Sequence, residues 1–410
     1  MGKVLGIIAE YNPFHNGHLY HLEQAKKITG SSYTVAVMSG NFTQRGNTAL
    51  IDKWSRTEIA LNCGIDLVLE LPTLYATSSA ENFADGAIKI LDSLKVVDYL
   101  AFGAETSDMD ILNPISDVLY QEPKAYKMLL SHELKKGISF PKARENALML
   151  YLGDIRKYLN VLSSPNNILG LEYMKFLKKY KSSIQPVAIA RFEAGYNDVT
   201  YSGNIASATA IRNIIKNGNF KIARNLMPAP SYGILIDNIK QGHIISDISV
   251  FEKQIFYNLR KMSLSEISEL PDVSEGLENS IKKAVNSCNT VVEFLNLVKS
   301  KRYTSTRIQR ILLYSLLGIT KKDMDLSKKV TPYIRVLGLN NRGKFLISEI
   351  AKASPKLEII TSVKRFVDTS TNKNLKNMLS KDIWATDIYS LGYDFDSCAN
   401  LDFSKKIVTI

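Results

Sequence analysis

Short apolar runs alternate with amphipathic stretches through the first part of the chain. Four runs are almost entirely apolar or rich in β-branched residues: Val4–Ala9, Tyr33–Met38, Asp66–Leu71 and Tyr99–Phe102. The stretches between them place apolar residues at helical spacing, over Leu19–Ile28, Lys53–Leu61 and Ala80–Leu91. Strands that alternate with helices at this rhythm are typical of βαβ units, and near-continuous apolar strands are typical of a parallel sheet covered on both faces. The pattern therefore predicts an α/β domain.

The pattern becomes mainly helical after this alternation. Apolar residues keep helical spacing over most of Ile111–Lys181. A further strand, Gln185–Ala190, and a helix, Ser207–Ile215, then return to the earlier alternation. We therefore predict a first domain over residues 1–225, with a helical insertion around residues 110–180.

Two prolines, Pro228 and Pro230, indicate a boundary after this domain. The chain beyond them is mostly helical in pattern, with candidate strands at Tyr333–Leu337 and Leu357–Thr361. We predict a second, mainly helical region over residues 226–410.

Composition narrows the class of protein. Of the 410 residues, 45% are hydrophobic and 22% are charged, which is ordinary for a globular protein. No uncharged apolar run approaches the ~18 residues of a membrane span, and Glu10 interrupts the first apolar run before any signal-peptide cleavage site. Cys63, Cys288 and Cys398 are too far apart for a disulfide framework or a zinc site. We expect a cytoplasmic protein without a membrane partner.

The net charge of +12 favours an anionic partner. The segment Lys299–Lys344 contains twelve basic and only two acidic residues, so it carries most of the excess. Four of these bases gather around Tyr303: Lys301, Arg302, Arg307 and Arg310. Cations beside an aromatic ring suit an RNA backbone and its unstacked bases, so we interpret these four residues as RNA-binding. The alternative is a solvated helix face, the usual role of a charged run.

The first strand is followed directly by Tyr11-Asn12-Pro13-Phe14-His15-Asn16-Gly17-His18, which opens the first helix. This position is the carboxyl edge of the predicted sheet, where open α/β folds bind ligands. A helix start attracts phosphate, and Gly17 permits close approach of a ligand to the backbone. His15 and His18 could stabilise charge that develops on a phosphorus atom, without any protein nucleophile.

Two other interpretations of this segment compete. His15 and His18 could simply start a helix. With His21 they could also bind a metal ion, but no acid or cysteine lies at matching spacing, so we predict no metal site. His21 by itself is interpreted as an ordinary helix-surface residue.

A later helix start reads Ser207-Ala208-Thr209-Ala210-Ile211-Arg212. Ser207 and Thr209 could bind phosphate oxygens, and Arg212 supplies a planar cation suited to a leaving pyrophosphate. The alternative is simple helix capping by Ser207, with Arg212 as surface charge.

Polar residues also follow the second strand, in Ser39-Gly40-Asn41-Phe42-Thr43-Gln44-Arg45-Gly46. They could contact a carboxylate or a phosphate, or form a polar surface loop. Asp52 is interpreted as the N-cap of the next helix. Lys53 and Arg56 could face the site or could lie on a solvated helix face.

The string His-x-Gly-His after a first strand resembles the nucleotidyltransferase superfamily. Residues 6–18 and 38–46 together resemble the bacterial tRNA(Met) cytidine acetate ligases, and the similarity continues through residues 301–310. The resemblance implies a Rossmann-like parallel-sheet nucleotidyltransferase domain with a mostly helical C-terminal region. It also implies ATP contacts at Ile7, Ile8, Ala9, Glu10, Tyr11, Asn12, Pro13, Phe14, His15, Asn16, Gly17, His18, Leu19, Tyr20, Gly103, Asn167 and Arg191, in addition to Ser207 and Thr209. Ala208 departs from the superfamily pattern, which usually has a second serine there.

The function implied is a two-step ligation. Acetate attacks the α-phosphate of ATP, and the N4 amine of the wobble cytidine of elongator tRNA(Met) then takes the acetyl group. His15, His18 and Arg212 are the expected catalytic residues, and Mg²⁺ is expected with ATP. Three alternatives stay open: a cofactor adenylyltransferase, an acetate ligase acting on a protein-bound thiol, and an RNA-binding protein with a regulatory nucleotide site.

Overall fold

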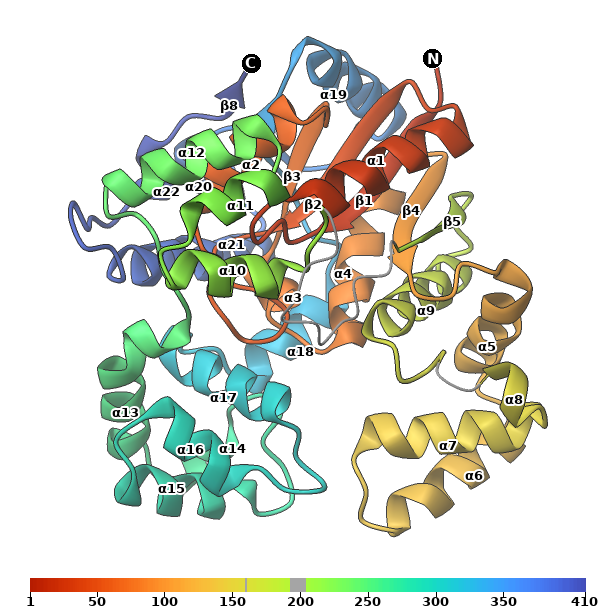
Figure 1. Ribbon diagram of the computed structural model, residues 1–410, viewed down its shortest axis with the longest axis vertical. Helices are drawn as coiled ribbons and strands as arrows, with labels where there is room; N and C mark the ends of the chain where they lie inside the picture. Colours follow the sequence, from red (N-terminus) through yellow and green to blue (C-terminus); the bar gives the residue numbers. More distant parts are fainter. Residues whose placement is uncertain (159–160, 192–203) are drawn as a thin grey trace.

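The computed structural model describes residues 1–158, 161–191 and 204–410. Their strands form one sheet in the order β5-β4-β1-β2-β3-β6-β7, with β8 paired to β6. Figure 1 shows β1 to β5 side by side in this sheet. The strands are β1 (Val4–Ala9), β2 (Tyr33–Ser39), β3 (Leu67–Leu71), β4 (Tyr99–Ala104), β5 (Gln185–Ala190), β6 (Ile334–Leu339), β7 (Ile359–Ile360) and β8 (Val408–Thr409). All pairings from β5 to β3 are parallel, which confirms the predicted α/β class.

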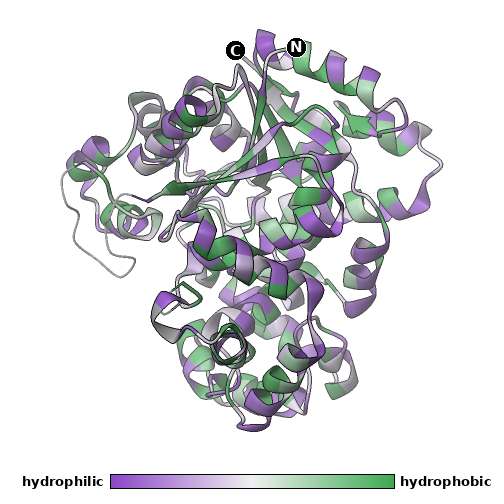
Figure 2. Cartoon of the chain, turned by 90° about the vertical axis from the view of Figure 1, so that its right-hand side faces the viewer, coloured by the Kyte–Doolittle hydropathy of each residue, from purple (hydrophilic) through white to green (hydrophobic). Residues whose placement is uncertain are grey.

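The two faces of the sheet support separate apolar cores, because successive strand residues point to opposite faces. Leu5, Ile7 and Met38 belong to one core, while Val4 and Val35 belong to the other. The first core is completed by α1 (Asn16–Thr29), α2 (Lys53–Asn62), α10 (Ala208–Lys216), α11 (Phe220–Leu226) and α12 (Ala229–Lys240). The second includes α3 (Thr73–Ala76), α4 (Ala80–Ser93), α9 (Pro165–Lys179) and α19 (Asn341–Ala353). In Figure 2 the largely hydrophobic strands lie between helices of mixed hydropathy.

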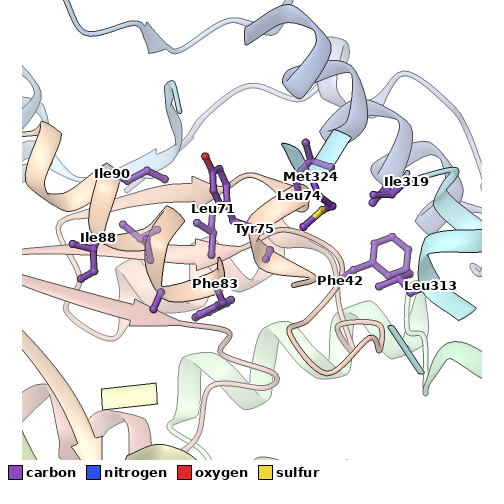
Figure 3. Close-up of a cluster of buried hydrophobic side chains, with 14 of the residues drawn as sticks. Phe42, Leu71, Leu74, Tyr75, Phe83, Ile88, Ile90, Leu313, Ile319 and Met324 are labelled. Carbon is purple, nitrogen blue, oxygen red and sulfur yellow. The ribbon is translucent and has the colours of Figure 1, made fainter. Parts of the chain in front are cut away.

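The second core continues without interruption into the C-terminal helices. In Figure 3, Leu74 and Tyr75 of α3 lie near Met324, and Phe42 lies near Leu313. Further elements of this region are α17 (Ser305–Leu317), α18 (Lys321–Lys329), α20 (Val363–Thr369), α21 (Lys373–Ser390) and α22 (Leu401–Ser404). The C-terminal helices therefore share a core with the sheet.

The sheet also crosses the predicted division between residues 225 and 226. Both candidate C-terminal strands form, as β6 and β7, and β6 pairs antiparallel with β3. Without β6, the wholly buried strand β3 would end the sheet with unpaired backbone groups. The apolar pattern located the strand β6 but not its partner.

Two helical lobes lie below the sheet in the view of Figure 1. The residues predicted as an insertion contribute α5 (Met109–Gln121), α6 (Lys124–Lys135), α7 (Phe140–Leu152) and α8 (Ile155–Tyr158). The other lobe contains η1 (Ile248–Phe251), α13 (Glu252–Lys261), α14 (Leu264–Ser268), α15 (Leu277–Ser287) and α16 (Val291–Val298). Within the described ranges, no helix combines the length and the apolar character needed to cross a membrane.

Four charged side chains lie buried where β3, β6, α2 and α22 meet. Lys53 Nζ is 2.8 Å from both Glu70 Oε1 and Asp402 Oδ1, and Arg335 Nη1 is 2.9 Å from Glu70 Oε2. Arg335 also pairs with Asp402. We call these four residues the buried charge cluster. Lys53 therefore neither faces the ligand site nor lies on a solvated helix face, because it neutralises two buried carboxylates.

Candidate active site

His15 and His18 lie together at the start of α1. His15 is the N-cap, and its Nδ1 accepts a hydrogen bond from the Gly17 amide at 3.0 Å. Nδ1 of His18 accepts from the His15 amide at 3.3 Å. The two rings stack with centroids 3.8 Å apart. Sequence reasoning placed the pair at the helix start, but it did not predict that both rings cap the helix.

Burial sets the charge of both imidazoles, and the capping bonds set their tautomer. Burial, together with the cations Arg191 and Arg212, lowers the pKa of His15 to about 3. Burial and the neighbouring His15 ring hold the pKa of His18 well below its usual value. Each ring is therefore neutral, and because its Nδ1 is an acceptor, its proton resides on Nε2. The pair presents two Nε2–H donors at the positive end of a helix dipole.

This charge state predicts an acid-sensitive fold. An unfolded histidine binds a proton near pH 6.5, whereas folded His15 does so only near pH 3, so stability is lost as pH falls through that interval. Between pH 7 and pH 5 the loss for this one group is about 2 kcal/mol. We expect His15→Gln to reduce the pH dependence of the unfolding free energy by that amount, measured by urea denaturation at the two pH values. An unchanged pH dependence would mean that folded His15 accepts protons freely.

The loop between β1 and α1 is held by buried polar contacts. Asn12 Oδ1 accepts from the Leu50 amide at 2.8 Å, and its Nδ2 donates to the Thr48 carbonyl. Arg56 donates to the carbonyl of Glu10 at 2.7 Å and to the carbonyls of Ser39 and Gly40. Arg56 thus holds the carboxyl ends of β1 and β2 together through hydrogen bonds to both. The alternative of a solvated helix face is wrong for Arg56, because its guanidinium is fully buried.

Asn16 and Phe14 connect this loop to the later motif. Asn16 Nδ2 donates to the Asn204 carbonyl at 2.8 Å and to the Asn225 carbonyl at 3.0 Å. The Ser231 hydroxyl donates to the Phe14 carbonyl at 2.6 Å. These bonds place the start of α10 beside the start of α1.

Arg212 of α10 is consequently brought to the first motif. Its Nη1 donates to the Asn12 carbonyl at 2.7 Å, and its Nη2 donates to Thr209 Oγ1 at 3.0 Å. Ser207 is the N-cap of α10, and its hydroxyl accepts a hydrogen bond from the Ala210 amide at 3.1 Å. The structure therefore agrees with the interpretation of Ser207 as a helix-capping residue. Burial lowers the pKa of Arg212, but an arginine guanidinium keeps its charge in proteins. The start of α10 therefore brings a fixed cation to the two neutral donors.

The ends of β4 and β5 form a second part of the site. Glu105 caps α9, since its carboxylate accepts from Asn166 Nδ2 at 2.6 Å and from the Asn167 amide at 3.0 Å. Asn167 is fully buried, and its Oδ1 accepts from the Thr106 amide. Its Nδ2 is buried without a hydrogen-bond partner among the described residues. That donor is available to a ligand at the edge of β4, and sequence reasoning missed the role of Glu105 in positioning it.

Gly103, Arg191 and His21 meet on the opposite side of β4. A methyl group at Gly103 would lie 3.5 Å from Arg191 Cγ and 3.7 Å from His21 Cδ2. His21 was interpreted as a helix-surface residue; its side chain is in fact half-buried, and its Nε2 is fully buried. The sequence did contain a signal for this position: His15, His18 and His21 are spaced by three residues, which places neighbouring side chains on the same face of a helix.

The loop after β2 contacts the same edge of the sheet. The Gln44 amide donates to Glu10 Oε1 at 2.7 Å, and Gln44 Nε2 donates to the Ser78 carbonyl at 3.0 Å. Thus the polar loop that sequence reasoning left ambiguous lies against the β1–α1 segment. A side chain at Gly40 would collide with Glu70 Oε1 at 2.7 Å, so this loop also rests on the buried charge cluster.

No group of three His, Cys, Asp or Glu side chains suited to a metal ion occurs in the described ranges. Glu10 is the carboxylate beside the β1–α1 loop, and it already accepts the Gln44 amide. The side chains present therefore do not fit a protein-held metal ion.

Residues 2–402 match a protein-family model described as HIGH Nucleotidyl Transferase. A tRNA(Met) cytidine acetate ligase from Caldanaerobacter subterraneus subsp. tengcongensis is 46% identical, with both chains covered completely. The chain belongs to the tRNA(Met) cytidine acetate ligase family. This confirms the predicted family and its ligase class. A tRNA(Met) cytidine acetate ligase from Acetivibrio thermocellus is 44% identical and covers 99% of each chain.

Solved structures of this family confirm the predicted fold. Thermotoga maritima TmcAL without ligand superposes with a TM-score of 0.94 at 36% identity, over 100% of this chain and 99% of that one. The same protein bound to alpha-thio ATP gives a TM-score of 0.93 at 35% identity. A nucleotide therefore binds a fold that matches this chain along its full length.

Proposed function

We propose that this chain joins acetate to a cytidine of tRNA(Met) at the expense of ATP. In the first step an acetate oxygen attacks the α-phosphorus, the bond to the bridging oxygen breaks, and pyrophosphate leaves with the bonding pair. In the second step the N4 amine of the wobble cytidine of elongator tRNA(Met) attacks the acetyl carbonyl. AMP leaves, a proton is released from nitrogen, and N4-acetylcytidine results.

The observation that carries this proposal is the pair of neutral imidazoles at the start of α1. Two Nε2–H donors aimed from a helix N-terminus stabilise the negative charge that grows on the phosphoryl oxygens during attack. A neutral pair leaves an incoming acetate ion free to approach without being trapped as an ion pair. The fixed charge of Arg212 is suited to the departing pyrophosphate.

The remaining proposed ATP contacts follow the sheet edge away from the helix start. Gly103 offers a strand end without a side chain, and the unpartnered Asn167 Nδ2 offers a donor. Arg191 adds a cation beside Gly103 and His21, and its charge lowers the pKa values of His15 and His18. We propose that the nucleoside occupies this edge.

The proposed tRNA-binding residues are not equivalent. Lys301 and Arg302 are exposed, and Arg302 pairs with Glu275 at the surface at 2.8 Å. Arg307 donates to the Asp272 carbonyl and stacks on Tyr303. Arg310 is buried, with its guanidinium held by Asp272 at 2.7 Å. We therefore base the proposed RNA contact on Lys301 and Arg302, since Arg310 does not present its charge to solvent.

Removal of both exposed cations is expected to weaken tRNA binding without affecting adenylate formation. For Lys301→Ala combined with Arg302→Ala, the slope of log binding constant against log salt should fall by about one to two units. A matched control is Lys352→Ala with Lys356→Ala, two exposed lysines at the end of α19 and just beyond it. Filter binding over a salt series measures the slope. Equal slopes in the wild type and the first variant would contradict the assignment.

Isotope exchange between pyrophosphate and ATP tests the first step. We expect exchange by the full chain only when acetate is present, because acetate is the proposed acceptor of the adenylyl group. Exchange that is independent of acetate, or that responds instead to a nucleotide or a phosphopantetheine, would sink the proposal and favour a cofactor adenylyltransferase.

A further inference from the structure

The third histidine of α1 has a buried nitrogen with nothing to bind. His21 Nε2 has no hydrogen-bond partner in the described part of the chain. Its ring is beside Gly103 and Arg191, one helical turn beyond His18. A buried polar atom without a partner costs free energy, and such atoms in native proteins call for an explanation. Here the surrounding residues are those proposed to hold ATP.

The position of His21 indicates which part of ATP it would meet. The phosphates are proposed to occupy the start of α1, next to the end of β1. In the sheet order β5-β4-β1, the next strand end is that of β4, where Gly103 lies. A nucleotide that extends from β1 toward β4 brings its sugar between the triphosphate and the base. His21 is placed along this route, after His18 and against Gly103.

The chemistry of the ring favours a hydroxyl group as its partner. Burial, together with Arg191, lowers the pKa of His21 to about 4, so the ring is neutral. Nε2 of a neutral imidazole is a donor in one tautomer and an acceptor in the other. A hydroxyl can serve either tautomer, whereas a phosphate oxygen can only accept. No described protein bond selects the tautomer here, unlike at His15 and His18.

We propose that His21 Nε2 hydrogen-bonds a ribose hydroxyl of ATP, which makes His21 a sugar-positioning residue of the site. The inference rests on the proposed function insofar as it takes ATP to bind at this edge. It adds a contact beyond the residues that the sequence implicated. It also gives a role to the spacing of His15, His18 and His21, in which two rings serve the phosphates and the third serves the sugar.

Binding of deoxynucleotides to the full chain tests the contact directly. We would measure dissociation constants for ATP, 2′-deoxyATP and 3′-deoxyATP by calorimetry, without acetate or tRNA, in the wild type and in His21→Phe. We expect one deoxynucleotide to bind the wild type about three- to tenfold more weakly than ATP. His21→Phe should weaken ATP by a similar factor and bind that deoxynucleotide no more weakly than the wild type does. The preference for ribose should therefore disappear.

Controls separate positioning from folding. His132→Phe changes an exposed histidine of α6 and should keep the wild-type preference. His21→Gln offers an amide in place of the ring nitrogen and should retain part of the preference. If His21→Phe does not fold, as judged by its unfolding temperature, His21→Gln and His21→Leu are compared instead. Equal ribose preference in the wild type and the apolar variant would overturn the inference, as would a wild type that binds all three nucleotides alike.

The outcome is distinguishable from failure of the proposed function. ATP binding with a His21-dependent ribose preference, but without acetate-dependent exchange, would reject the ligation proposal and keep the sugar contact. Acetate-dependent exchange with unaltered ribose preference in His21→Phe would reject the sugar contact alone.

Discussion

His18→Ala lowers the rate of acetate-dependent pyrophosphate–ATP exchange by about a hundred- to a thousandfold, the usual cost of deleting one donor to transition-state charge. The variant loses a neutral Nε2–H at the start of α1, and it also loses the ring that stacks on His15 and orders the helix cap. The proposed tRNA contact involves Lys301 and Arg302, which follow α16, and not the start of α1. The tRNA affinity of the variant should therefore stay within about twofold of the wild type.

His132→Ala is the matched control, because His132 is exposed on α6 and belongs to no motif. It should leave both exchange and tRNA binding unchanged. If His18→Ala catalyses exchange at more than about a tenth of the wild-type rate, the proposal that the imidazole pair stabilises the transition state is wrong. Simultaneous loss of exchange and tRNA binding would instead indicate a folding defect, which the unfolding temperature would reveal.

Arg335→Met is expected to cost about 3–5 kcal/mol of unfolding free energy, the range typical of breaking a buried ion pair. Arg335 is fully buried and contacts both Glu70 and Asp402. Without it, two buried carboxylates share the single charge of Lys53. Because Asp402 belongs to α22 and Glu70 to β3, the loss should loosen the C-terminal segment from the sheet.

Urea denaturation compares this variant with Arg302→Met. Arg302 forms a surface pair with Glu275 in which both side chains are more than half exposed, so its loss should cost at most about 1 kcal/mol. A similar small cost for Arg335→Met would show that water enters the buried charge cluster and that the cluster does not tie α22 to the sheet.

The strands were predictable because most of their residues are apolar or β-branched. Val4–Ala9 and Gln185–Ala190 form strands at the predicted residues. The partner of β6 was not predictable, since pairing between residues 67–71 and 334–339 leaves no periodic trace in either segment. The continuity of the second core from α3 to α18 has the same origin: contacts between distant segments are invisible to local patterns.

The site was predictable where one short segment carried both position and chemistry. His15 and His18 follow a strand and open a helix, so their location was implied by order alone. Charged residues were harder to place, because a cation looks the same in sequence whether it is solvated or buried. Lys53, Arg56 and Arg310 all proved to be buried, and each is held by partners far away in the sequence or by backbone carbonyls.

His21 shows the same difficulty. An isolated histidine on a helix was assigned to the surface, yet the turn of α1 that follows His18 directs His21 toward Gly103 of β4. The three-residue spacing already implied that His21 shares a helix face with His18. Only the structure shows that this face lies against Gly103 and Arg191.

The central claim is that this chain activates acetate with ATP and delivers it to a tRNA cytidine. The most direct measurement incubates the full chain with ATP, labelled acetate and elongator tRNA(Met), digests the RNA and separates its nucleosides. The account predicts label in N4-acetylcytidine alone, dependent on ATP and absent with His18→Ala. Unlabelled tRNA, under conditions in which the Caldanaerobacter relative labels the same substrate, would contradict it.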